Sequence, residues 1–107
     1  MMELPRGYKV EGKSLNLDNK KNKEWKEITV SLKVPSKYDI LTLEDVDYIN
    51  QECIKTEDCL YLNKSIDGRV YVVAFDVVKK KINEKKFIEE IPKRFQKAMR
   101  KFKEMNS

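Results

Sequence analysis

The sequence predicts an α+β fold in which a small antiparallel sheet of about five strands packs against two helices. Three patterns predict this fold. Apolar and polar residues alternate over 27–34, Asp67-Gly68 is a strong hairpin signal, and apolar residues recur at helical spacing over 88–105. The expected element order is β-β-β-α-β-β-α, which favours an antiparallel sheet with its helices packed against it.

Length and composition are typical of one globular domain, residues 1–107. The chain is 40% hydrophobic and 38% charged, and it carries more large apolar residues than a disordered chain does. We expect disorder only at 1–7 and 104–107. The longest uncharged segment, 70–75, is too short to cross a membrane, and no apolar signal segment opens the chain. With only two cysteines, the expected location is the cytoplasm.

The amino-terminal part is polar, with short alternations at 8–10 and 15–17 that predict two strands joined near Glu11-Gly12. Residues 18–24 follow as a loop rich in Asn and Lys. The next segment, EITVSLKV, is apolar on one face at Ile28, Val30, Leu32 and Val34. It is therefore predicted as a half-buried strand.

A helix is predicted from Thr42, which can cap it, to about residue 54. Its apolar positions at helical spacing are Leu43, Val46, Ile49 and Cys53. Its acidic residues are Glu44, Asp45, Asp47 and Glu52. These carboxylates do not share one face, so a solvated face is favoured over a metal site, and a basic partner protein is the alternative.

The segments 59–64 and 69–78 flank the hairpin signal. A two-residue type I′ turn would place Leu62 opposite Val73. The predicted core face then consists of Leu60, Leu62, Tyr71, Val73, Phe75 and Val77. The opposite face is also rich in apolar residues, so we expect a helix of this chain or a partner to cover part of it.

The last predicted helix begins after Asn83, its expected cap. Its apolar stripe consists of Ile88, Ile91, Phe95, Ala98, Phe102 and Met105. Pro92 lies within the stripe and cannot donate to the carbonyl group of Ile88. We therefore expect this long helix to kink near Pro92 or to restart there.

The net charge of +5 is concentrated at the carboxyl end. Residues 79–107 carry 11 basic and 4 acidic side chains, whereas residues 1–78 carry 12 basic and 14 acidic side chains. The excess positive charge therefore lies entirely in the last quarter. Such asymmetry bears on binding partners and not on the fold.

Basic side chains dominate the second half of the last helix, at Lys93, Arg94, Lys97, Arg100 and Lys101. A row of cations on one rigid element suits a polyphosphate backbone. The competing interpretation is a solvated face whose cations complement the helix dipole, which is what most charged segments prove to be. The dipole acts over the last turn only, whereas these cations span nearly three turns. Both interpretations stay open.

The sequence offers little for catalysis. Histidine is absent, no Ser or Cys stands beside a plausible base, and there is no glycine-rich phosphate loop. Cys53 and Cys59 lack the two further ligands that zinc requires. We expect no enzyme, metal or cofactor. The cysteines are interpreted as small buried apolar residues, with a disulfide left open.

We therefore hypothesise a non-enzymatic accessory protein that contacts the phosphate backbone of nucleic acid through its basic helix. Lys79, Lys80, Lys81 and Trp25, with the Lys20–Lys26 loop, are assigned supporting contacts. No signature of sequence-specific readout is present. The alternative is an interaction or inhibitor module of viral or plasmid origin. It would act on the acidic surface of a partner protein through complementary charge, or through a homodimer interface.

Overall fold

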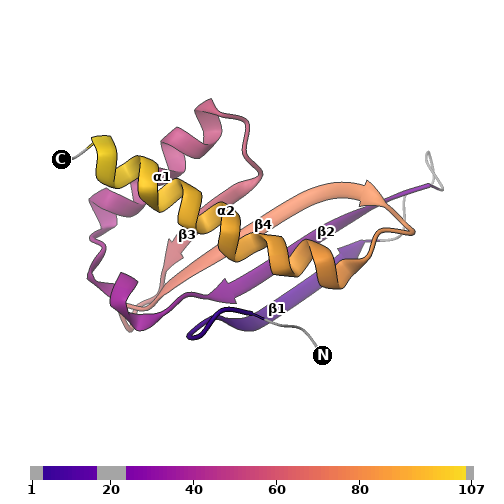
Figure 1. Ribbon diagram of the computed structural model, residues 1–107, viewed down its shortest axis with the longest axis horizontal. Coiled ribbons are helices and arrows are strands. Elements are labelled where there is room, and N and C mark those ends of the chain that lie inside the picture. The colour runs from indigo at the N-terminus through magenta and orange to yellow at the C-terminus, as the bar shows by residue number, and fades with distance from the viewer. Residues whose placement is uncertain (1–3, 17–23, 106–107) are drawn as a thin grey trace.

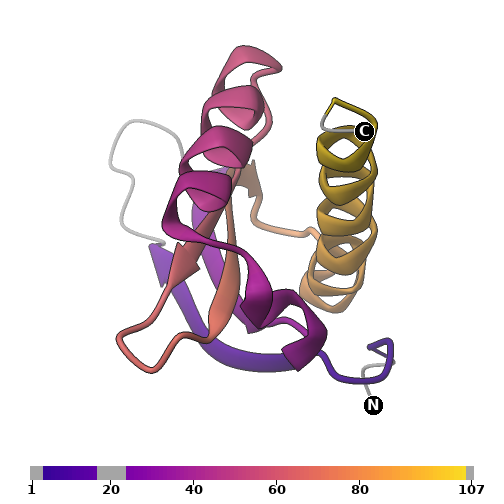
Figure 2. The same ribbon diagram turned by 90° about the vertical axis from the view of Figure 1, so that its left-hand side faces the viewer.

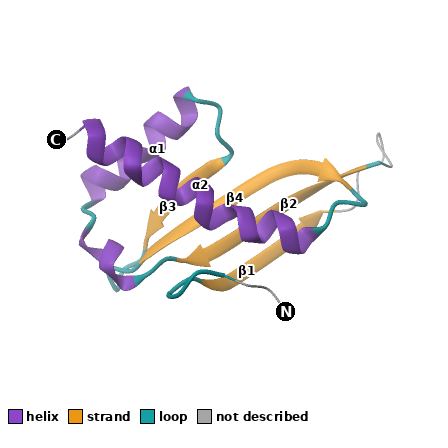
Figure 3. Ribbon diagram, viewed as in Figure 1, coloured by secondary structure: helices purple, strands orange, loops and turns teal. Residues whose placement is uncertain are grey.

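The computed structural model describes residues 4–16 and 24–105. The elements in chain order are β1 (Lys9–Asn16), β2 (Trp25–Lys33), the 3-10 helix η1 (Ser36–Ile40), α1 (Leu43–Lys55), β3 (Leu60–Lys64), β4 (Val70–Lys79) and α2 (Glu84–Met105). The four strands form one antiparallel sheet in the order β1-β2-β4-β3 (Figures 1 and 3). The α+β class and the long carboxyl-terminal helix are confirmed.

Helix α2 crosses one face of the sheet, and α1 lies beside β3 (Figures 1 and 2). One apolar core joins the two helices to that face of the sheet, and it includes Val30, Leu32, Val72, Ile91 and Phe95. No helix of the described chain covers the opposite face, where Tyr61, Phe75 and Val77 are exposed.

Asn50 of α1 fixes the helix against the edge strand β3. Its side-chain amide donates to the carbonyl oxygen of Leu62 at 3.0 Å, and its side-chain oxygen accepts from the backbone N–H of Leu62 at 2.7 Å. These two bonds occupy backbone groups that an edge strand otherwise leaves unpaired. Helix α1 therefore closes part of the sheet edge as well as part of the core.

The amino-terminal part forms a single strand, so the predictions of two strands joined near Glu11-Gly12 and of about five strands in all are wrong. The register with β2 shifts between Val10 and Gly12, which marks an irregularity of the bulge type. A bulge accommodates an extra residue, and the strand continues beyond it. In the sequence the same extra residue interrupts the alternation of apolar and polar residues, which predicts the end of a strand. Leu17 and all of the predicted 18–24 loop except Glu24 lie outside the described residues.

The hairpin has a five-residue loop, so the predicted two-residue turn is wrong. Leu60 lies opposite Ala74 and Leu62 opposite Val72, one residue away from the expected register. The loop is fixed by Ser65, whose N–H donates to the carbonyl of Arg69 at 2.8 Å and whose hydroxyl accepts from the N–H of Arg69 at 3.1 Å.

A one-residue shift transfers every side chain of a strand to the other face of the sheet. The predicted core residues of β4 therefore lie on the uncovered face. Phe75 and Val77 are exposed there, whereas Val73 is buried and Tyr71 is half-buried. The residues of β4 that enter the core are Val70, Val72, Ala74 and Val78. Leu60 and Leu62 of β3 are buried as predicted.

Both helix starts agree with the sequence. The hydroxyl of Thr42 accepts from the N–H of Asp45 at 3.1 Å, and the carboxylate of Asp45 accepts from the N–H of Thr42 at 3.0 Å, which forms a capping box. The side-chain oxygen of Asn83 accepts from the N–H of Lys85 at 3.1 Å. Leu43, expected on the apolar side of α1, is exposed instead.

Helix α2 continues through Pro92, which is buried, so a restart at this position is excluded. Its buried residues are Ile88, Ile91, Pro92, Phe95 and Met99. The predicted stripe is therefore correct for Ile88, Ile91 and Phe95, and Ala98 and Phe102 are half-buried against the core. Met99, which was not predicted, is buried, whereas Met105 is 55% exposed. Glu104 and Met105 belong to the helix, and Leu4 packs against the core.

Candidate nucleic-acid interface

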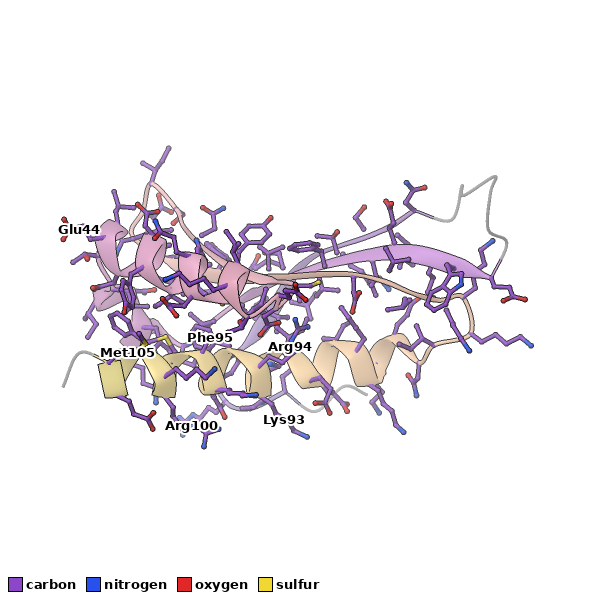
Figure 4. The ribbon with its side chains drawn as sticks, turned by 90° about the horizontal axis from the view of Figure 1, so that it is seen from above. Glu44, Lys93, Arg94, Phe95, Arg100 and Met105 are labelled. Atoms are coloured by element: carbon purple, nitrogen blue, oxygen red, sulfur yellow. The ribbon has the colours of Figure 1, made fainter. Side chains whose placement is uncertain are left out.

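The second half of α2 presents a row of cations to solvent. Its exposed basic residues are Lys93, Lys97, Arg100, Lys101 and Lys103, which are called the basic face below. In Figure 4, Lys93 and Arg100 point away from the sheet, whereas Arg94 and Phe95 lie on the side that faces the rest of the protein. The buried stripe anchors one side of the helix and leaves these cations exposed.

Most of these cations take part in no ion pair with another described residue. Among residues 4–16 and 24–105, none of the ion pairs includes Lys97, Arg100, Lys101 or Lys103. Lys93 pairs with Glu90 at 3.5 Å, and both side chains are mostly exposed. Such a surface pair is worth at most about 1 kcal/mol and does not remove Lys93 from the basic face.

Arg94 lies apart from the basic face. Its guanidinium donates to the carboxylate of Asp58, which follows α1, and about 27% of the Arg94 side chain is exposed. The residue thus joins α2 to the turn after α1. Of the five cations that the sequence assigns to this helix, Arg94 is thus held in a partly buried ion pair within the protein.

Lys79, Lys80 and Lys81 lie at the other end of the molecule from most of the basic face, where β4 ends and α2 begins (Figure 1). Lys80 is held there by its N–H, which donates to the carbonyl of Glu24 at 2.8 Å. From Glu84 to Lys97 the helix rises by about 20 Å. The structure therefore does not bring the three lysines together with Lys97 and the residues that follow it.

Trp25 is half-buried in β2, opposite Lys79 of β4. Its neighbour Lys26, which the sequence places in the basic loop, is only 5% exposed and pairs with Glu84 at 3.2 Å. Lys26 is therefore a structural residue and not a surface contact. Lys20, Lys21 and Lys23 lie outside the described residues.

Glu84 receives a second ammonium group. Lys13 of β1 lies 3.0 Å from its carboxylate, so this acid joins β1 and β2 to the first turn of α2. The hydrogen bonds from Lys13 and Lys26 hold the pKa of Glu84 below its ordinary value. The carboxylate also lies at the positive end of the helix dipole.

Three tyrosines outside the predicted core have defined ring contacts. Tyr8 and Tyr38 pack edge-on against Phe95, with ring centroids 6.3 and 4.9 Å away. Tyr61 packs against Phe75 on the uncovered face, with ring centroids 5.8 Å apart. The ring of Tyr38 also lies beside the basic face, where it lines a shallow hollow together with Arg100 and Lys103.

Sequence reasoning missed a groove of about 190 Å³ between α1 and α2. Tyr48, Ile49 and Cys53 line it from α1, and Ala98 and Phe102 line it from α2. Lys97 and Lys101 lie at its margin. The available signal was Tyr48, an aromatic residue next to a core position in α1 and without a place in the predicted core.

Both cysteines are free, Cys53 buried and Cys59 half-buried. Burial raises the pKa of the Cys53 thiol, and the Asp58 carboxylate adds to this effect. Among the residues that the structure describes, no three His, Cys, Asp or Glu side chains gather in an arrangement that could hold a metal ion.

No family model matches the chain, and neither the curated proteins nor the solved structures contain a match to it. Within the described ranges, no helix combines the length and the apolar character needed to cross a membrane.

Proposed function

We propose that this protein binds nucleic acid in the cytoplasm without catalysing a reaction, through contacts between the basic face of α2 and phosphate groups. The observation that carries the proposal is the exposure of Lys97, Arg100 and Lys101 without an ion pair in the described chain. All three are exposed, and none takes part in an ion pair within the described chain. Their charge is available to an external polyanion.

The spacing of the cations supports a phosphate backbone as ligand. Lys93 and Lys103 lie ten residues apart, which is about 15 Å along the helix axis. The five cations of the basic face thus provide about one positive charge per 3 Å. One strand of a duplex carries one phosphate per about 3.4 Å of its axis. The two charge densities are therefore well matched.

Complementing the helix dipole accounts for only part of this charge. Only Lys103 lies in the last turn of α2, where the dipole acts. The other cations begin at Lys93, more than two turns earlier, and two arginine or lysine residues per turn exceed what capping requires. A ligand that spans several turns explains the whole row.

The salt dependence of binding tests the proposal. Fluorescence anisotropy with labelled single- and double-stranded DNA and RNA would be measured over a series of salt concentrations. The double variant Lys97→Glu/Arg100→Glu should bind more weakly and lower the slope of log affinity against log salt by about 2 for duplex DNA. The matched control is Lys85→Glu/Lys86→Glu, with the same charge change in the first turn of α2.

The control variant should retain most of the affinity, since Lys85 and Lys86 lie at least about 16 Å along the helix from Lys97 and Arg100. Equal losses in both variants would mean that net charge alone drives binding. Absence of salt-dependent binding by the unmodified protein would overturn the proposal.

A protein partner is the second candidate, and the uncovered face of the sheet favours it. Tyr61, Phe75 and Val77 expose 41%, 44% and 51% of their surfaces there, side by side on β3 and β4. Neighbouring apolar residues of this size commonly mark an interaction surface. If Tyr61→Ser/Phe75→Ser abolishes association with a partner while nucleic-acid binding is absent, this second function holds.

A further inference from the structure

The groove between α1 and α2 has the composition of a small-molecule site. Its volume is about 190 Å³, and it is bounded by the two helices and by the turn that contains Asp58. Sites of this kind combine an apolar interior with a few polar groups at defined positions, and they often lie between packed helices.

The interior of the groove is apolar. Ile49 and Cys53 are buried on the α1 side, and Ala98 and Phe102 are half-buried on the α2 side. The ring of Phe102 lies 6.0 Å from that of Tyr48, measured between centroids. A ligand that enters between the helices therefore meets aliphatic and aromatic carbon.

The charges around the groove favour an anion. Both carboxylates that line it are occupied within the protein, since Glu52 pairs with Lys55 at 3.0 Å and Asp58 with Arg94. Lys97 and Lys101 also line it, lie one helical turn apart, and take part in no ion pair of the described chain. The groove therefore offers two ammonium groups beside an apolar interior.

We propose that this groove binds a small apolar carboxylate. The apolar part, one aromatic ring or an alkyl chain of similar volume, would lie between Ile49, Ala98 and Phe102, and the carboxylate would lie between Lys97 and Lys101. The size is consistent, because an apolar protein cavity of about 150 Å³ holds a benzene ring. This proposal does not depend on the phosphate-binding function, although the two sites share Lys97 and Lys101.

The test is a titration of the ¹⁵N-labelled protein, followed by NMR chemical shifts, with 3-phenylpropionate as the probe. We expect saturable shifts for residues of the groove and a dissociation constant on the order of 1 mM or below, in the range open to so small a ligand. The uncharged analogue 3-phenylpropanol and the cationic 3-phenylpropylamine should bind at least about tenfold more weakly, because they cannot pair with the ammonium groups.

Two variants separate the parts of the site. Lys97→Gln/Lys101→Gln should weaken binding of the carboxylate by about tenfold and leave binding of the alcohol unchanged. Ala98→Trp should fill the groove and abolish binding of all three probes. Since Ala98→Trp can also disturb folding, the exposed lysine pair provides the decisive comparison, and Lys85→Gln/Lys86→Gln serves as its matched control.

A third variant distinguishes this site from the phosphate-binding function. Lys93→Glu/Arg100→Glu changes two cations that do not line the groove, so it should weaken nucleic-acid binding and retain binding of 3-phenylpropionate. The carboxylate proposal is overturned if the unmodified protein shows no saturable shifts, if the shifts map elsewhere, or if the alcohol binds as tightly as the carboxylate.

Discussion

Arg94 of α2 donates a hydrogen bond to the carboxylate of Asp58, the residue that leaves the turn after α1. The two side chains are 27% and 31% exposed, so the pair is partly shielded from water. It connects the two helices at one end of the groove. This contact explains why Arg94, although part of a basic sequence segment, does not contribute to the basic face.

The Arg94–Asp58 pair should stabilise the fold. We expect Arg94→Ala and Asp58→Ala each to lower the free energy of unfolding by about 1 kcal/mol, with a coupling energy of about 0.5–1 kcal/mol in the double variant. Urea unfolding of the unmodified protein, the two single variants and the double variant measures the coupling energy. Lys93→Ala is the control, since its pair with Glu90 is mostly exposed. Strictly additive losses would contradict a direct interaction.

Glu57 should be a site where glycine stabilises the protein. Helix α1 ends with N–H groups of Glu57 and Asp58 donating to the carbonyls of Ile54 and Cys53, and Glu57 has φ +56°. A side chain is unfavourable in this left-handed conformation by about 1–2 kcal/mol, whereas glycine is not. After the greater chain entropy of unfolded glycine is deducted, Glu57→Gly should raise the free energy of unfolding by about 0.5–1 kcal/mol.

Thermal or urea unfolding checks this gain. Glu57→Ala is the matched control, because it removes the same carboxylate and keeps the Cβ atom. An equal gain in both variants would assign the effect to charge and not to backbone conformation.

The hairpin register predicts opposite responses at two positions of β4. Val72 is fully buried, so Val72→Asp would place an unpaired charge in the core and cost several kcal/mol, enough to unfold the protein. Phe75 lies on the uncovered face, so Phe75→Asp should change the free energy of unfolding by about 1 kcal/mol or less. Circular dichroism and urea unfolding distinguish them. The reverse order of effects would support the two-residue turn.

Stability should fall in acid through Glu84. The hydrogen bonds from Lys13 and Lys26 lower the pKa of this carboxyl in the folded state. Its ionised form therefore stabilises the fold above its unfolded pKa, and this contribution is lost as the pH falls through the folded value. Glu84→Gln should be less stable than the unmodified protein at neutral pH, and the difference should shrink toward acid.

Urea unfolding between about pH 7 and pH 3 measures this difference. Glu90→Gln, which removes an exposed carboxylate from the same helix, is the control. A difference between Glu84→Gln and the unmodified protein that stays constant over this range would contradict the linkage.

Local signals in the sequence were sufficient for the helix starts, because the capping groups at Thr42 and Asn83 act within a few residues. They were insufficient to predict which residues of β4 face the core, because this depends on the length of the hairpin loop. A glycine such as Gly68, with φ +86°, is compatible with a loop of two or of five residues. The row of cations on α2 was visible in the sequence. The sequence could not show that Arg94 pairs with Asp58 or that Lys26 is buried against Glu84. These two contacts join residues that are 36 and 58 positions apart in the chain.

Asn50 also restricts how copies of this chain could assemble. The sheet ends at β1 on one side and at β3 on the other, and Asn50 occupies the outward backbone groups of Leu62 in β3. Strand-to-strand growth needs two open margins on every molecule. If two molecules joined through β1, both outer margins of the combined sheet would be β3 strands shielded by α1. Further sheet extension would therefore meet occupied backbone groups at Leu62 on both margins, which opposes propagation into a fibre.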